Sequence, residues 1–176
     1  MSCWRATAVG MTVVALGCGG STAPGPDTFR VDVAGTSLTL TALLVNPAAD
    51  QGAGGIGYNL SGSMTLPDAS VDFFGVTFSS AAGTTSGSVD CATTPGIGGR
   101  LPLEFVFTRE TSTDTATYQN DAQDDACAAA FSKIPGSLRG GRLVGSFGGS
   151  VRRMGANGPE VLDVTNGYVD VTIPPA

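Results

Sequence analysis

The side chains best suited to chemistry in this sequence are the carboxylates of one polar stretch. Asp121, Asp124 and Asp125 follow Asp114 in a segment rich in Thr, Gln and Asn. Carboxylate oxygens are the ligands that Ca²⁺ prefers, but this run lacks the central glycine and the alternating spacing of a known calcium loop. A solvated acidic loop is the favoured interpretation, and a calcium-binding module is the alternative.

The composition excludes the common catalytic systems. The sequence contains no histidine, which removes Ser-His-Asp and Cys-His nucleophiles, histidine bases and histidine metal ligands. It also contains neither a G-x-S-x-G nor an S-x-x-K motif. Glu104 and Glu110 leave a carboxylate pair for glycoside hydrolysis formally open, but Glu104 falls on the polar face of a predicted strand. We expect no enzyme activity, catalytic metal or cofactor, with a carboxylate-dependent hydrolase as the weaker alternative.

Tyrosines are the candidates for a carbohydrate-binding role, since such modules stack sugars on exposed aromatic rings. Tyr58 alternates with apolar residues and is expected in the core. Tyr118 and Tyr168 are therefore the candidate ligand-binding residues. An ordinary half-exposed ring on a strand is the favoured interpretation of each, and a carbohydrate-binding module is the alternative.

A glycine-rich pattern at residues 52–57, GAGGIG, matches the G-x-G-x-x-G of dinucleotide-binding proteins. That motif holds a pyrophosphate only where a helix N-terminus follows it. Residues 58–66 instead alternate apolar and polar, as a strand does. We therefore expect no nucleotide site here.

The charge balance argues against nucleic acid as a partner. The formal net charge is −6, and only 14% of residues are charged, so the chain lacks the basic footprint that nucleic-acid binding needs. Five basic residues nevertheless fall close together in the sequence: Lys133, Arg139, Arg142, Arg152 and Arg153. Solvated turn and strand positions are the favoured interpretation, and a local anion-binding or partner patch is the alternative.

The first eighteen residues have the layout of a secretory signal. Arg5 precedes an apolar run from residue 6 to residue 16 that is too short to span a bilayer. The run ends in Ala15-Leu16-Gly17-Cys18, which resembles the lipobox of bacterial lipoproteins, although a leucine is usual where Ala15 stands. A plain secretory signal and a buried apolar helix are the alternatives.

The resemblance implies a location. Residues 1–17 would be a cleaved signal peptide, Cys18 would carry palmitate and other acyl chains, and residues 18–27 would be a flexible linker to a domain over 28–176. Gly19, rather than an aspartate, follows the lipidated cysteine, which by the sorting rule of enteric bacteria indicates the outer membrane. The membrane would then be one partner, and an envelope protein or a glycan would be the other.

The resemblance also implies a pairing of cysteines. Cys3 would leave with the signal and Cys18 would take the lipid, so Cys91 and Cys127 remain. Two cysteines beyond the cytoplasmic membrane are expected to form a disulfide. Closing a loop of this length stabilises a fold by roughly 3.5–4 kcal/mol in the chain-entropy model. Two free buried thiols are the alternative.

The elements that must position these residues are short strands. Low charge and 26 glycines favour strands and tight turns over helices. We predict an all-β fold, an antiparallel β-sandwich or open barrel of about seven to nine short strands. The pattern further predicts a loop over 46–57, a bulge at Phe73-Phe74 and a hairpin turn at Asn166-Gly167. Residues 122–134 are ambiguous, with strand narrowly favoured over helix for 126–134.

Residues 145–151 and 164–171 look like the C-terminal pattern of small bacterial β-sandwich lipoproteins, a group with no established activity. The resemblance supports the fold and transfers no function. We therefore expect a lipid-anchored envelope protein with a non-catalytic interaction or structural role.

Overall fold

The computed structural model describes residues 27–50, 55–91, 103–120, 126–155 and 160–176. Their strands form one antiparallel sheet of eleven strands that is not closed into a barrel, which confirms the predicted fold class but exceeds the predicted strand count. No helix in these ranges is long and apolar enough to cross a membrane. Cys18, Asp121, Asp124 and Asp125 lie outside the described residues.

The strands are β1 Thr28–Val33, β2 Thr36–Thr39, β3 Thr41–Asp50, β4 Gly55–Thr65, β5 Val71–Ala81, β6 Gly87–Asp90, β7 Leu103–Glu110, β8 Thr115–Gln119, β9 Cys127–Lys133, β10 Gly141–Arg153 and β11 Val161–Ile173. β9 confirms the strand expected at residues 126–134. β3 continues to residue 50 and β4 begins at residue 55, so the loop predicted over 46–57 is wrong for residues 46–50 and 55–57. The glycine-rich pattern ends inside β4, and no helix follows it.

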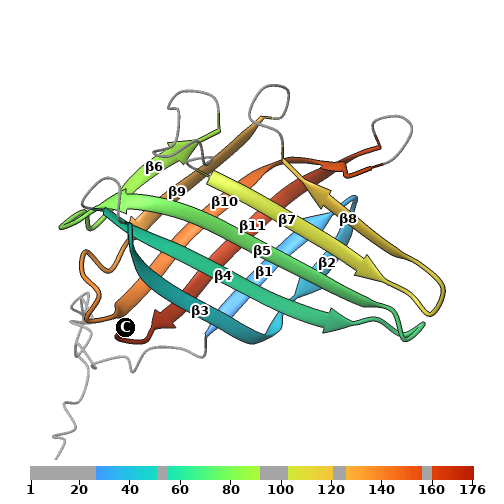
Figure 1. Cartoon of the computed structure of the whole chain (residues 1–176), viewed down its shortest axis with the longest axis horizontal. Helices are drawn as coiled ribbons and strands as arrows, with labels where there is room; N and C mark the ends of the chain where they lie inside the picture. The colour runs from blue at the N-terminus through green and yellow to red at the C-terminus, as the bar shows by residue number, and fades with distance from the viewer. Residues whose placement is uncertain (1–26, 51–54, 92–102, 121–125, 156–159) are drawn as a thin grey trace, which may run out of the picture.

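The sheet folds over so that two sets of strands cross. Its order is β2-β1-β11-β10-β8-β7-β5-β4-β3, with β9 pairing β10 and β6 pairing β9. In Figure 1, β3, β4, β5 and β7 pass in front of β1, β10 and β11 at a steep angle. The two end strands of the path, β2 and β3, follow each other in the chain. They meet at Leu40, a buried residue whose N–H donates to the Phe29 carbonyl over 2.8 Å.

Aromatic rings fill the space between the two layers. Phe147 of β10 lies 5.8 Å from the ring of Phe74 on β5 and 5.5 Å from that of Phe105 on β7, between ring centroids. Phe131 of β9 stacks on Phe78 of β5 at 4.2 Å. Such rings bury large apolar areas and favour these offset geometries. The face of β10 that carries Leu143, Phe147 and Val151 is therefore part of the core.

Two glycines make room for those rings. Phe131 lies over its cross-strand partner Gly145, and Phe147 lies over its partner Gly167. A Cβ at either glycine would collide with the ring beside it. The glycines on the inward face of this part of the sheet are therefore packing surfaces for phenylalanine.

Cys91 and Cys127 form the predicted disulfide, with their Cα atoms 5.3 Å apart. The bridge lies where the sheet forks, because β10 pairs with β9 along most of its edge and with β8 at its end. The buried side chain of Asn120 lies beside the disulfide and bonds to the backbone of β7. Its Nδ2 donates to the Leu103 carbonyl over 3.0 Å, and its Oδ1 accepts from the Phe105 N–H over 2.5 Å.

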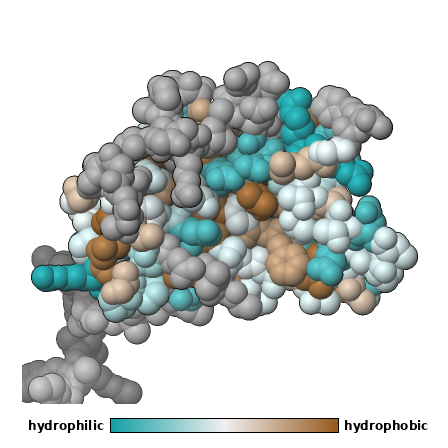
Figure 2. Space-filling view, in the orientation of Figure 1, coloured by the Kyte–Doolittle hydropathy of each residue, from teal (hydrophilic) through white to brown (hydrophobic). Residues whose placement is uncertain are grey.

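The bulge predicted at Phe73-Phe74 is wrong. β5 pairs in unbroken register with β4 and β7 through both residues. Phe74 is buried, whereas Phe73 points outward and is 43% exposed. The apparent slip in the apolar pattern comes from an aromatic residue on the outer face. On the side of the molecule seen in Figure 2, hydrophobic surface is divided into small groups among hydrophilic and neutral residues.

Candidate functional site

The candidate site is built around a β-bulge in β11 at Asn166. Both neighbours of β11 show the same irregularity. Along β1, Arg30 pairs with Tyr168 and Asp32 pairs with Thr165, so two residues of β11 lie opposite one residue of β1. Along β10, two residues of β11 again lie opposite one residue, and Asn166 is in both pairs. Asn166 has a φ of 52°, a left-handed conformation that asparagine tolerates better than most residues. The predicted hairpin is therefore wrong, because the chain continues straight on between two partner strands.

The bulge changes which residues of β11 face the core. Before it, Val164 is buried; after it, the buried positions are Gly167, Val169, Val171 and Ile173. One extra residue shifts the alternation by one position. That extra residue, Asn166, is exposed on the outer face, the surface of the sheet turned away from the core.

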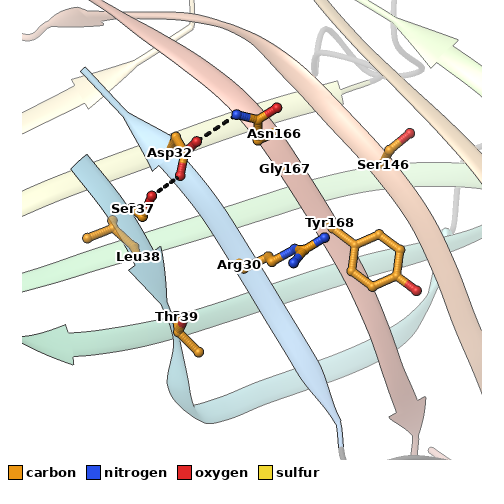
Figure 3. A pocket seen from close by; sticks show the side chains of 9 residues that line it. All are labelled: Arg30, Asp32, Ser37, Leu38, Thr39, Ser146, Asn166, Gly167 and Tyr168. Carbon is orange, nitrogen blue, oxygen red and sulfur yellow. Dashed lines mark hydrogen bonds between the residues drawn. The ribbon is translucent and has the colours of Figure 1, made fainter. Parts of the chain in front are cut away.

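Asp32 receives the Asn166 side chain. Asn166 Nδ2 donates to one carboxylate oxygen over 2.7 Å, and Ser37 Oγ donates to the other over 2.6 Å. Figure 3 shows Asp32 of β1 held between Ser37 of β2 and Asn166 of β11. These hydrogen bonds, first from Asn166 and then from Ser37, lower the pKa of Asp32 below its ordinary value of 3.8. The carboxylate is therefore ionised at neutral pH and fixed in orientation.

Tyr168 and Arg30 lie two residues from Asn166 on β11 and from Asp32 on β1, respectively. The two residues are cross-strand partners, and the Arg30 guanidinium carbon lies 5.2 Å from the centre of the Tyr168 ring, a cation–π distance. The ring is half-buried, so part of it stays accessible. Both line a hollow of about 570 Å³ on the outer face of β2, β1, β11 and β10. We call it the tyrosine hollow.

A second hollow adjoins the first. It lies over β10, β9 and β6, and it shares Ser146, Asn166 and Gly167 with the tyrosine hollow. Its floor includes Ala128 and Ala130, which are exposed on the outer face of β9. We call it the alanine hollow. The two hollows thus lie side by side over six neighbouring strands.

The structure separates the two tyrosines that the sequence singled out. Tyr118 is only 6% exposed; its ring packs on Phe107 and its hydroxyl donates to Glu160 over 3.0 Å. Burial, followed by the hydrogen bond to Glu160, raises the pKa of Tyr118. The Tyr118 ring thus offers no open face for stacking, whereas Tyr168 lines the tyrosine hollow. Tyr58 is in the core, as predicted.

The other sequence candidates do not converge. Glu104 and Glu110 lie six positions apart on one strand, about 20 Å along β7. Arg142 and Arg153 lie near opposite ends of β10, where Arg142 pairs with Asp27 and Asp170, and Arg153 lies near Glu160. Of the five basic residues, Lys133 ends β9, Arg139 lies between β9 and β10, and Arg152 and Arg153 lie at the other end of β10 from Arg142, so they form no single patch. No group of His, Cys, Asp and Glu within the described ranges could hold a metal ion.

Sequence reasoning identified Tyr168 but missed its neighbours. Arg30, Asp32 and Ser37 carry no signal in the sequence beyond that of polar residues among apolar ones, and Asn166 was assigned to a turn. The one available signal was the Asn-Gly pair itself, since Asn adopts positive φ in a bulge as readily as in a turn. No protein-family model, curated protein or solved structure matches this chain.

Proposed function

We propose that this protein is a non-catalytic binding module, held at the cell envelope by a lipid on Cys18, whose tyrosine hollow contacts the ligand. One observation carries the proposal: the Asn166 bulge brings a fixed carboxylate, an amide and a half-exposed tyrosine together on an open face. β-Bulges are over-represented next to functional sites, where they re-aim a side chain.

The lipid anchor rests on the resemblance of residues 15–18 to a lipobox. Each buried CH₂ of an acyl chain contributes about 0.8 kcal/mol to the free energy of membrane binding, so several chains on one cysteine anchor a protein stably. β1 begins ten positions after Cys18, and a flexible linker of that length spans roughly 15–20 Å. The tyrosine hollow would thus work close to the membrane surface.

The anchor is tested by metabolic labelling of the full chain with radioactive palmitate in a bacterial host. Label should enter the wild-type protein and be absent from Cys18→Ala, which should appear in the soluble fraction. Label in the variant, or a wild-type protein that starts at residue 1, would overturn the anchor.

The binding face is tested by sedimentation of the Cys18→Ala protein with isolated cell-wall sacculi and with outer-membrane vesicles. Tyr168→Ala should reduce the bound fraction at least tenfold, because the hollow loses its only aromatic side chain with accessible surface. Phe73→Ala is the matched control, since Phe73 is an exposed ring on β5 in the other layer. Equal loss in both variants, or no loss with Tyr168→Ala, contradicts the proposal.

A further inference from the structure

We infer that the ligand is a neutral oligosaccharide chain that lies across the strands, with one end in the tyrosine hollow and the rest over the alanine hollow. The inference rests on the proposed function and names its ligand class. Four features of the two hollows carry it: their charge, their hydrogen-bonding groups, the Tyr168 ring and their combined length.

The charges of the lining disfavour a polyanion. The tyrosine hollow contains one cation, Arg30, and one anion, Asp32; the alanine hollow adds one more carboxylate, Asp90. A site for a phosphate-rich or uronate-rich chain needs an excess of Arg and Lys. The tyrosine hollow has no such excess, since its one cation and one anion balance. Its lining therefore suits a neutral ligand better than an acidic chain.

The hydrogen-bonding groups match hydroxyls, which both donate and accept. Each Asp32 oxygen accepts one bond within the protein and has a further lone pair for a ligand. The Asn166 amide supplies an acceptor and a second donor hydrogen, and the hydroxyls of Ser37, Thr39 and Ser146 also line the hollow. A polyhydroxylated ring uses such a mixed set fully, whereas a purely donating or accepting ligand leaves half of it unpaired.

Tyr168 provides the apolar part of the same hollow. A sugar ring has one face of C–H bonds, and an aromatic ring buries that face while leaving the hydroxyls at its edge for polar groups. Figure 3 shows the Tyr168 ring turned away from Asp32, with Arg30 between them. The hollow thus holds an aromatic surface at one end and fixed polar groups at the other, and apolar surface with a few placed polar groups is what orients a ligand in a site.

The combined length of the hollows indicates a chain of sugars. The hollows run from β2 over β1, β11, β10 and β9 to β6, and five spacings between neighbouring strands amount to about 24 Å. Ala128, Ala130 and Gly148 leave the floor of the alanine hollow without a large side chain. One sugar ring would fill only the tyrosine hollow, so the second hollow serves the rest of a longer ligand.

The test is isothermal titration of the Cys18→Ala protein with neutral hexaoses of glucose, mannose, galactose and N-acetylglucosamine. Shorter disaccharides and an oligogalacturonate of equal length are the comparisons. One neutral hexaose should bind at least tenfold tighter than its disaccharide, and oligogalacturonate should not bind. Tyr168→Ala and Asp32→Asn should each weaken hexaose binding at least tenfold, and Phe73→Ala should leave it unchanged.

A second variant separates the two hollows. Ala130→Arg places a long side chain on the floor of the alanine hollow and should weaken the hexaose at least tenfold while leaving the disaccharide unaffected. Ala128→Arg is the substitute if that variant does not fold. Tyr168-dependent sedimentation with sacculi, but no binding of any neutral hexaose, would overturn the ligand class and leave the binding module intact. Sedimentation independent of Tyr168 would overturn the proposed function as well.

Discussion

Deleting Asn166 should remove the bulge and leave the fold intact. Val164 and Gly167 both face the core, so after the deletion the sequence from Val164 to Ile173 alternates without interruption. The existing pairs of β11 with β1 and β10 on either side of the bulge also come into one continuous register. The fold therefore does not require the extra residue, and only the outer face uses it.

The stability change should accordingly be small. The deletion removes an exposed side chain and no buried one, and asparagine tolerates the left-handed conformation that is lost. We expect the free energy of unfolding in urea to change by less than about 1 kcal/mol. Deleting Asp170 from the same strand is the matched control. It would turn Val171 and Ile173, both at most 1% exposed, toward solvent, at about 1.5–3 kcal/mol each.

The assay combines urea unfolding with titration of the hexaose that binds the unaltered site. Ligand affinity should fall at least tenfold in the Asn166 deletion, because Asp32 loses the donor that orients it. A deletion that costs more than about 3 kcal/mol would show that the bulge is part of the fold. Unchanged affinity in a stable deletion would show that the bulge does not build the site.

Three further predictions concern the disulfide, the glycines and pH. Replacing Cys91 and Cys127 together by serine should lower the free energy of unfolding by roughly 3.5–4 kcal/mol through the loop of 36 residues that the bridge closes; an unchanged urea midpoint would contradict this. Gly145→Ala should destabilise by about 1–3 kcal/mol through overpacking against the facing ring, and a thermal melt equal to that of wild type would refute the packing role. Because Asn166 lowers the pKa of Asp32 below 3.8, the stability that Asp32 contributes is complete above pH 3.8 and is lost as the pH falls through the lowered value. Asn166→Ala should raise the Asp32 pKa in a carbon-detected NMR titration; an unchanged pKa would exclude Asn166 as the cause.

Alternation predicted much of the fold because it reports local geometry. Leu143, Phe147 and Val151 face the core as their spacing indicates, and β9 is the strand that was narrowly favoured. The pattern failed where an apolar residue faces outward, as Phe73 does. Periodicity alone does not separate an exposed aromatic from a bulge, because both place two apolar residues in succession.

The site depended on information that no local pattern contains. Asn166 and Asp32 are 134 positions apart in the chain, and their contact requires β11 to lie between β1 and β10. An Asn-Gly pair closes a hairpin when its flanking segments pair with each other. It forms a bulge when both segments pair with other strands, and long-range topology decides between these outcomes.

The most direct test of the ligand-contacting face is an NMR titration of the ¹⁵N-labelled Cys18→Ala protein with the neutral hexaoses and with solubilised cell-wall fragments. We predict shifts of backbone amides in β1, β2, β11, β10 and β9 around Asp32, Asn166 and Tyr168, and none in β4 and β5. Shifts centred on β4 and β5, or no shifts with any of these ligands, would contradict this prediction.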